Sequence, residues 1–212
     1  MKIITYATHS DGTFDELVNN KFGFKIDVIG WGEKWVGYKG KCESIRKYLD
    51  TIDDNEIVVS LDGFDTKINK DPTLSENIFK KMKCGMLMSK DGYKGGEYIT
   101  KCIFGTCKNN QTANAGMYMG YCWCIKQVLD NVLKYSCKDD QRNINTLCES
   151  YDYIKVDEDE KVFKNLLNTS SSHDSIFLGF PFELSFKRVY RGYVIEYPQF
   201  FINTITLVAL GL

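Results

Sequence analysis

One mostly apolar run, Glu56–Leu61, limits the folds open to this chain more than any other segment. Its β-branched side chains suit a strand buried on both faces, and such strands belong to parallel sheets that helices cover. The preceding stretch, Lys41–Ile52, carries apolar residues at helical spacing, and an earlier run, Phe24–Ile29, predicts another strand. Strand, helix and strand in this order form the unit from which parallel sheets are built. We therefore expect an α/β fold.

The remaining segments continue the alternation of strands and helices. Further strands are predicted over Lys2–Ala7, Gly85–Ser89 and Met117–Gly120, and further helices over Phe14–Asn20, Pro72–Lys83, Trp123–Tyr135 and Asp139–Ser150. After Tyr153 the pattern weakens to hairpin-like pieces over Phe177–Phe186 and Val189–Ile195. Because no internal repeat and no linker rich in Pro, Gly or Ser is visible, residues 1–212 are expected to form a single domain.

Composition and the chain ends exclude several classes of function. The formal net charge is −1, so the sequence predicts no nucleic-acid surface. The apolar run Met1–Tyr6 is too short for the core of a signal peptide, which favours a cytoplasmic protein. The apolar stretch Phe200–Leu212 is shorter than the roughly 20 residues that a membrane span needs. It is expected to be a last strand or part of the core, with no membrane span.

The cysteines do not follow a metal-binding pattern. There are eight of them but no Cys-x-x-Cys pair, and the only histidines are His9 and His173. A structural zinc site usually has closely spaced ligand pairs. We therefore expect most of the cysteines to be small buried apolar residues in a reducing compartment.

Two carboxylates, Asp62 and Asp65, directly follow the buried strand. They are expected at the carboxyl edge of the sheet, which is where open α/β sheets bind ligands. Carboxylates are hard oxygen ligands for Mg²⁺ or Mn²⁺, and these cations in turn hold phosphate oxygens. Acidic residues are also common in turns, so this spacing by itself leaves a structural role open.

An ordered series of motifs around these carboxylates resembles one known family. The series comprises Tyr6–Thr8, the loop Gly30–Trp35, Lys41, Leu61–Asp65, Gln111–Gly120, Lys138–Gln141 and Val162–Leu166. It is similar to the glycosyltransferase domain of the multifunctional procollagen lysyl hydroxylases and of their giant-virus relatives. The resemblance implies a fold of the glycosyltransferase-A type, a Rossmann-like mixed sheet flanked by helices.

The resemblance also implies a reaction. The chain would transfer glucose from UDP-glucose to galactosylhydroxylysine of a collagen-like glycoprotein acceptor, with Mn²⁺ as the cation and Mg²⁺ as the alternative. Three other readings stay open: a UDP-galactose-dependent hydroxylysine galactosyltransferase, a non-catalytic UDP-binding pseudo-transferase, and a scaffold domain in which the cysteines are the working part. A homodimer is also left open.

Carried over to this sequence, the resemblance assigns the metal ligands. Asp62 and Asp65 would hold the cation, with Asp62 also close to the donor, and the cation would stabilise the leaving diphosphate as the glycosidic bond breaks. The family supplies a third ligand from a late histidine, which this sequence lacks. Asn203 lies near the equivalent place and could offer a carbonyl oxygen, a weaker ligand for Mn²⁺ than imidazole.

The resemblance further implies a set of donor-binding residues. Thr8 would contact the nucleoside, Phe64 would lie against the uracil ring, and Trp35 would lie near the donor. Lys41 would pair its ammonium with diphosphate oxygens. For Lys41 the structural alternative is a solvated lysine at the start of a helix. For Trp35 it is a side chain that covers the sheet edge together with Trp31.

The last group implied by the resemblance would act on the sugars. Asn114, with the small residues Ala115 and Gly116, would shape the sugar pocket. Asp139 and Asp140 would orient the transferred sugar or the acceptor hydroxyl, as catalytic carboxylates can. The structural alternative is that these two aspartates only cap the helix that follows them.

Overall fold

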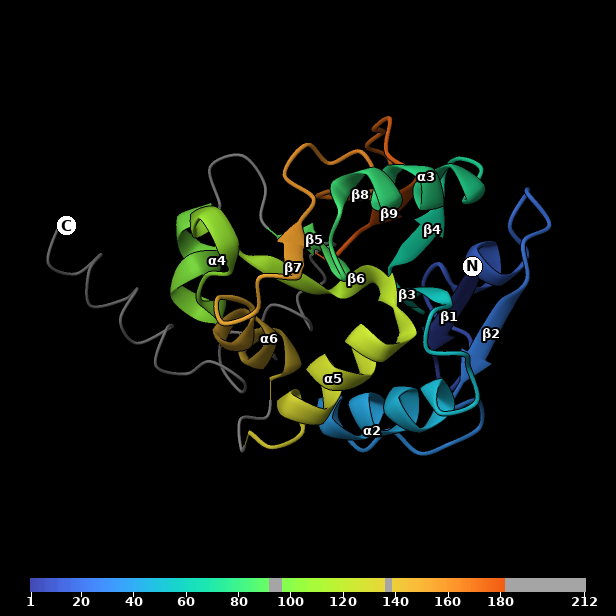
Figure 1. Ribbon diagram of the computed structural model, residues 1–212. Helices are drawn as coiled ribbons and strands as arrows, with labels where there is room; N and C mark the ends of the chain where they lie inside the picture. Colours follow the sequence, from blue (N-terminus) through green and yellow to red (C-terminus); the bar gives the residue numbers. More distant parts are fainter. Residues whose placement is uncertain (92–96, 136–138, 182–212) are drawn as a thin grey trace, which may run out of the picture. The chain divides into compact units, whose positions relative to one another are not determined.

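A mixed six-stranded sheet forms the centre of the structure (Figure 1), a computed structural model that describes residues 1–91, 97–135 and 139–181. Its strands are β1 (Lys2–Tyr6), β2 (Ile26–Ile29), β3 (Ile57–Asp62), β5 (Met86–Lys90), β6 (Ala113–Tyr121) and β7 (Ile154–Val156). Their order across the sheet is β2-β1-β3-β6-β5-β7. β1 runs parallel to β2 and β3, β6 runs antiparallel to β3 and β5, and β5 runs parallel to β7. The expected α/β fold with a mixed sheet is confirmed.

A smaller sheet and a set of helices complete the described part. The small sheet has the order β4 (Thr66–Ile68), β9 (Phe177–Gly179) and β8 (Phe163–Asn165). The helices are α1 (Phe14–Val18), α2 (Tyr38–Leu49), α3 (Thr73–Met82), α4 (Glu97–Phe104), α5 (Cys122–Val132) and α6 (Asp140–Cys148), with the 3₁₀ turn η1 (Lys108–Asn110).

The two faces of the central sheet bury different sets of apolar side chains, because successive strand residues point to opposite faces. Val58 of β3 joins the cluster that includes Ile45 of α2 and Ile125 of α5. Its neighbour Val59 joins the cluster that includes Phe79 of α3. The helices α2, α5 and α6 therefore cover one face, and α3 with the small sheet covers the other (Figure 1). This two-sided burial explains why β3 is mostly apolar, with Ile57, Val58, Val59 and Leu61 all buried.

Several element boundaries differ from the prediction. α2 begins at Tyr38, three residues before the predicted start, because Gly37 ends the preceding loop with φ +93°, a backbone conformation that glycine adopts readily. β6 begins at Ala113, four residues before the predicted strand, because its small residues pair within the sheet. The hairpin expected from Phe177 onward is not formed within the described residues, where β9 pairs instead with β8 and β4.

One pair of cysteines departs from the expectation of free thiols. Cys107 and Cys148 form a disulfide, with their Cα atoms 5.1 Å apart and a sequence separation of 41 positions. Among the described cysteines, Cys42, Cys84, Cys122 and Cys124 are buried and free, and Cys102 is exposed. Cys107 lies just before η1 and Cys148 ends α6, so the disulfide fastens the end of α6 to the segment that leads into β6.

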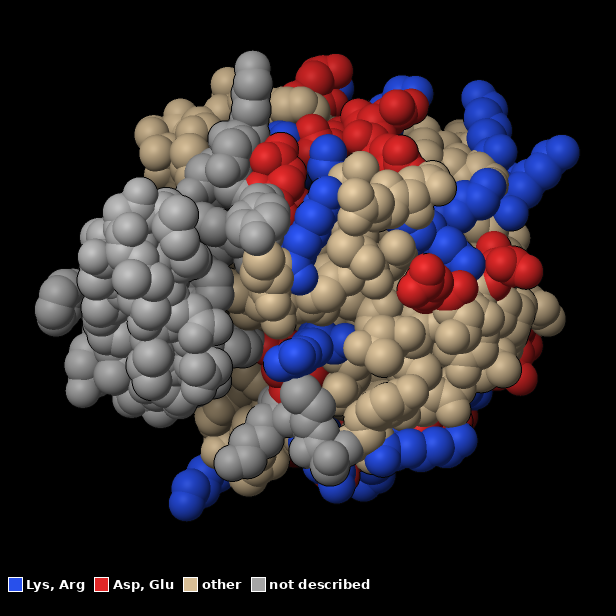
Figure 2. Space-filling model, turned by 90° about the vertical axis from the view of Figure 1, so that its left-hand side faces the viewer, with Lys and Arg blue, Asp and Glu red and all other residues tan. Residues whose placement is uncertain are grey.

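The face of the molecule in Figure 2 shows no strong bias of charge among the described residues. On the face in Figure 2, lysine and arginine side chains lie among aspartate and glutamate side chains, in keeping with the net charge of −1. Among residues 1–91, 97–135 and 139–181, no helix is both long enough and apolar enough to cross a membrane. The strands or core segments predicted over Val189–Ile195 and Phe200–Leu212 lie outside the described residues. The single domain over residues 1–212 therefore stays a prediction, of which Met1–Pro181 forms one compact unit.

Candidate active site

The carboxyl end of β3 brings a buried lysine against two carboxylates. Lys41, in the first turn of α2, places its Nζ 2.5 Å from Oδ1 of Asp62 and 3.8 Å from Oδ2 of Asp140. The lysine side chain is only 9% exposed, whereas that of Asp62 is 35% exposed. Lys41 is therefore not a solvated lysine at a helix start, and the structure joins three residues that the sequence placed in one site.

The charges of this cluster perturb one another. Burial by itself would lower the pKa of Lys41, but Asp62 and Asp140 outweigh it and hold that pKa well above its usual value. Burial is the main cause that raises the pKa of Asp140 to about 6, with the charges of Asp62 and Asp139 adding to it and Lys41 opposing it. A carboxyl group with a pKa near neutral suits acid–base work at ordinary pH.

The start of β6 approaches the same carboxylates through small residues. A Cβ atom built on Gly116 would lie 2.9 Å from Oδ2 of Asp62 and 2.9 Å from Oδ1 of Asn114. The Gly116 N–H donates to that Asn114 oxygen over 2.8 Å. Any larger residue at this position would displace one of the two polar side chains, so the glycine is what lets both keep their places. The grouping of Asn114 and Gly116 beside the acidic segment follows the resemblance.

Two polar residues of this site had no role in the sequence analysis. Asp91, 3% exposed, follows β5, and its Oδ2 accepts a hydrogen bond of 2.6 Å from Nε2 of Gln141. Oε1 of Gln141 accepts from Nδ2 of Asn114 over 3.3 Å. Asp91 thus fixes the amide groups that hold the start of β6. A sequence signal exists, because Asp91 follows a predicted strand as Asp62 does, but its Lys-Asp-Gly context is typical of a turn.

The two neighbouring aspartates of the acidic pair point to different partners. Oδ1 of Asp139 accepts from the backbone N–H of Arg142 over 3.0 Å and caps α6. Asp140 instead turns its carboxylate toward Lys41. The capping role that the sequence left open therefore describes Asp139, whereas Asp140 is the member of the pair that reaches the charged cluster.

The loop after β1 closes on the acidic segment. The ring of Phe64 lies 5.1 Å from the ring of His9, whose Nδ1 is 2.9 Å from the hydroxyl of Thr8. Gly12 has φ +55°, and a Cβ on it would lie 1.9 Å from the carbonyl oxygen of Phe64. Thr8 and Phe64, both expected near the nucleoside, are thus brought to the same end of the site.

The tryptophans of the glycine-rich loop remain accessible. Trp35 is 39% exposed and contacts Tyr6 and Tyr38, with ring centroids 5.9 and 5.6 Å apart. Trp31 is 56% exposed and stacks on Phe14 at 5.0 Å. Each ring therefore packs on one aromatic neighbour or more while part of it stays exposed, and the contact of Trp35 with Tyr6 places it at the end of β1.

The expected metal ligands are only partly in place among the described residues. Asp62 is the last residue of β3 and Asp65 follows the strand, and Asp62 keeps a second oxygen besides the one that Lys41 contacts. Two carboxylates fit a hard cation that takes its other ligands from phosphate and water. Within the described ranges, no group of three His, Cys, Asp or Glu residues is placed to hold a metal ion. Asn203, the third expected ligand, lies outside those ranges.

Comparison with known proteins identifies the family. A family model described as the PLOD GT domain, the glycosyltransferase domain of procollagen lysyl hydroxylases, matches residues 1–179. The chain belongs to this family. It is therefore a UDP-sugar glycosyltransferase of the PLOD GT family, and its mixed sheet flanked by helices is the glycosyltransferase-A class expected from the resemblance.

Solved structures and curated proteins were compared as well. The PLOD GT chain is similar to a crystal structure of a galactosyltransferase, LgtC, in complex with donor and acceptor sugar analogues. The identity is 14%, the TM-score is 0.48, and the match covers 85% of this chain and 87% of that one. A search of curated proteins gave no match.

Proposed function

We propose that this member of the PLOD GT family transfers glucose from UDP-glucose to galactosylhydroxylysine of a collagen-like protein, with Mn²⁺ as its cation. The observation that carries the proposal is the cluster of Lys41, Asp62 and Asp140 at the carboxyl edge of β3. A buried ammonium beside an accessible carboxylate suits a site that binds a diphosphate together with a divalent cation. The family supplies the sugar donor and acceptor of the proposal.

The proposed cation ligands are Asp62 and Asp65. Diphosphate oxygens would be further ligands of the cation, and Asn203 is proposed as a third ligand from the protein. When bound, the cation would neutralise the negative charge that develops on the departing UDP, and Mg²⁺ could serve in its place.

The protein's own residues would bind and orient the donor. Phe64 and Thr8 lie at one end of the site, where they would receive the uracil ring and the nucleoside. Trp35, exposed and anchored on Tyr6, would cover the donor from the glycine-rich loop. Lys41 would hold the carboxylate of Asp62 in place and lie beside the diphosphate.

Asp140 and Asn114 would act on the sugar end. At pH values above its pKa of about 6, Asp140 is ionised, and its carboxylate would accept a hydrogen bond from a hydroxyl of the sugar or the acceptor. Asn114, fixed by Gln141 and Gly116, would offer its amide to the hydroxyls of the transferred sugar. Asp139 is proposed to support Asp140 by capping α6 and so holding its first turn in place.

The test is the release of UDP from UDP-glucose with Mn²⁺, with and without a galactosylhydroxylysine peptide. Asp65→Asn should lower turnover about 100-fold or more, because it weakens the cation that stabilises the leaving group. Asp152→Asn is the matched control, since its side chain is fully exposed and lies on another part of the chain, and turnover should stay within about twofold. Equal turnover in both variants would refute the proposed role of Asp65.

The other readings predict different outcomes of the same assay. Preference for UDP-galactose with a hydroxylysine peptide would support the galactosyltransferase. A further reading is a non-catalytic module that binds UDP without turning it over. It would show a higher melting temperature with UDP and Mn²⁺ but no UDP release, because a ligand that binds only the folded state stabilises it. A scaffold would respond to neither.

A further inference from the structure

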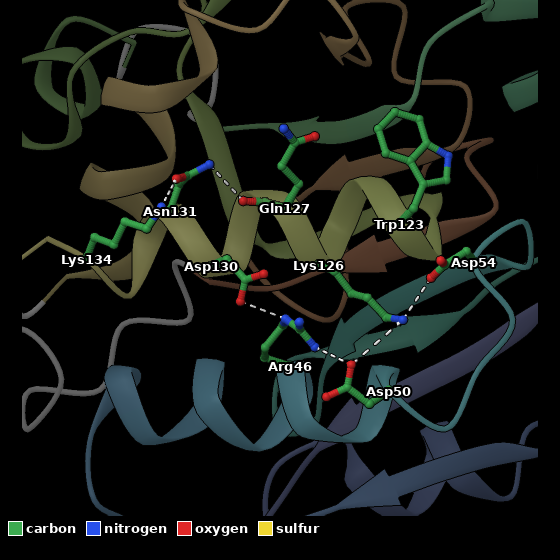
Figure 3. Close-up of a pocket in the computed structure, with 9 residues that line it drawn as sticks. All are labelled: Arg46, Asp50, Asp54, Trp123, Lys126, Gln127, Asp130, Asn131 and Lys134. Carbon is green, nitrogen blue, oxygen red and sulfur yellow. Dashed lines mark hydrogen bonds and ion pairs between the residues drawn. The ribbon is translucent and has the colours of Figure 1, made fainter.

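A hollow lies between α2 and α5 (Figure 3). Its volume is about 500 Å³. It is lined by Arg46, Asp50, Asp54, Trp123, Lys126, Gln127, Asp130, Asn131 and Lys134. We call it the α2–α5 hollow. Asp50 follows Lys41 by nine residues, which is about 13 Å along a helix, so the hollow is separate from the catalytic cluster.

The charged side chains of the hollow form a continuous chain of ion pairs. Nε of Arg46 lies 2.7 Å from Oδ1 of Asp130, and Nη1 of Arg46 lies 2.6 Å from Oδ1 of Asp50. Nζ of Lys126 lies 3.8 Å from that Asp50 oxygen and 2.8 Å from Oδ1 of Asp54. Each carboxylate keeps a second oxygen, and the three aspartates are 48% to 64% exposed. The pairs therefore hold planar acceptors in fixed positions while leaving them open to a ligand.

The charges of the hollow sum to zero, which selects the kind of ligand. Three cationic residues face three anionic ones, so neither a phosphate nor a metal cation finds an excess of the opposite charge. The same polar lining is unsuited to a lipid chain. What fits is a neutral ligand that is rich in hydrogen-bonding groups.

An aromatic ring lies beside this polar surface. Trp123 is 39% exposed, and it rests edge-on against Tyr153 with ring centroids 5.7 Å apart. Gln127 and Asn131 follow it at four-residue spacing along α5, so the three side chains lie on one side of that helix (Figure 3). The Tyr153 hydroxyl donates to Gln127 over 3.1 Å, which fixes the amide next to the indole.

We propose that the α2–α5 hollow is a carbohydrate-binding site. A sugar ring is neutral, has a C–H face that packs on an aromatic ring, and has hydroxyls that pair with carboxylates, amides and guanidinium groups. Trp123 supplies the ring, and Gln127 with the ion-paired aspartates and Arg46 supplies the polar groups. The volume suits a ligand of one or two sugar units. The inference concerns binding on another face of the molecule and does not depend on the proposed reaction.

The test is titration of the full chain with methyl galactoside, methyl glucoside and their disaccharides, in saturating UDP and Mn²⁺. Binding is followed by calorimetry and by saturation-transfer NMR. Trp123→Ala should weaken saccharide binding about 10-fold or more, and Trp123→Phe, which keeps an aromatic face, about threefold or less. Gln127→Ala, on the surface of α5, should weaken it about threefold to tenfold without unfolding the chain. Asp62→Ala at the other site should leave it unchanged.

Two outcomes would overturn the proposal. One is a folded wild-type chain that binds none of these saccharides at the millimolar concentrations used. The other is binding that survives both Trp123→Ala and Gln127→Ala but disappears in Asp62→Ala, which would place the sugar at the carboxyl edge of β3. The saccharide-binding results could be interpreted even if the chain released no UDP in the earlier assay, because the titrations measure binding and not turnover.

Discussion

Replacing Lys41 by methionine should lower the free energy of unfolding by about 3 kcal/mol at pH 7.5. Methionine keeps the length and the apolar stem but removes the ammonium that lies 2.5 Å from Asp62 and 3.8 Å from Asp140. Removing one partner of a buried ion pair costs about 3–5 kcal/mol, because the other charge stays buried and unpaired. The lower end applies since the Asp62 side chain is 35% exposed and water can solvate it in part.

Lys39→Met is the matched control for this experiment. Lys39 lies in the same turn of α2, but its side chain is 68% exposed and its Nζ is 3.9 Å from an equally accessible Glu43. An exposed pair of this kind contributes about 0.5 kcal/mol or less. Because both variants replace lysine by methionine in one helical turn, differences in helix propensity cancel. Urea denaturation gives both free energies, provided that the slope with denaturant is the same.

A double variant tests the assigned cause. If the loss in Lys41→Met comes from two carboxylates left without a cation, Asp140→Asn should stabilise the Lys41→Met background more than it stabilises wild type, by about 1–2 kcal/mol. The reasoning is refuted if Lys41→Met and Lys39→Met destabilise equally, or if Asp140→Asn stabilises the Lys41→Met background no more than wild type.

Three further predictions follow from other contacts. Gly12→Ala should lower the free energy of unfolding, measured with urea, by about 3 kcal/mol, because its Cβ would meet a backbone oxygen at 1.9 Å. Gly23→Ala, also at positive φ but with nothing within 4 Å, should lose only about 1 kcal/mol, and equal losses would contradict this. Between pH 4 and 7, Asp140→Asn should gain up to about 3 kcal/mol in free energy of unfolding relative to wild type. The folded wild type binds the Asp140 proton more tightly (pKa about 6, from 3.8), so it loses this stabilisation as pH rises through 6, whereas the variant does not; parallel pH profiles would rule this out. The double variant Cys107→Ala with Cys148→Ala should lose about 4 kcal/mol of stability, as expected for a disulfide with a sequence separation of 41. The loss should appear as a lower melting temperature, which reductant should also produce in wild type; an unchanged melting temperature in the double variant and in reduced wild type would disprove the disulfide's contribution.

The parts of the fold that the sequence predicted are those with strong local patterns. β3 is predicted because four of the five residues Ile57–Leu61 are apolar and three of these are β-branched, and α5 because its apolar residues recur at helical spacing. β4, β7 and α4 were missed, because three-residue strands and a short helix carry too few residues for a period to show. β6 was predicted too short, since Ala113–Gly116 is read locally as a loop and becomes a strand only through its neighbours.

The residues of the candidate site likewise fall into those that the sequence predicted and those that only the structure revealed. Asp62 stands out in the sequence because it follows a buried strand, and Asn114 and Asp140 come from the resemblance. The contact of Lys41 with Asp62 joins residues 21 positions apart, and that of Asp91 with Gln141 joins residues 50 apart. Such contacts depend on how helices and strands meet, which no local pattern records. Asp91 and the disulfide were therefore found only in the structure.

The pairing of β5 with β6 changes register at the site. Met88 pairs with Tyr118 and the next residue, Ser89, pairs with Asn114, so one step along β5 spans four along β6. The backbone of the skipped stretch is held by side chains instead: the Ala115 N–H donates to Gln141 and the Gly116 N–H to Asn114. Here the position of the main chain depends on two amide side chains, one from α6 and one from β6 itself. Substituting Asn114 or Gln141 would therefore reshape the main chain here while leaving the remaining pairs of the sheet as they are, and under the proposed function this is a local means by which relatives of this chain could come to accept different sugars.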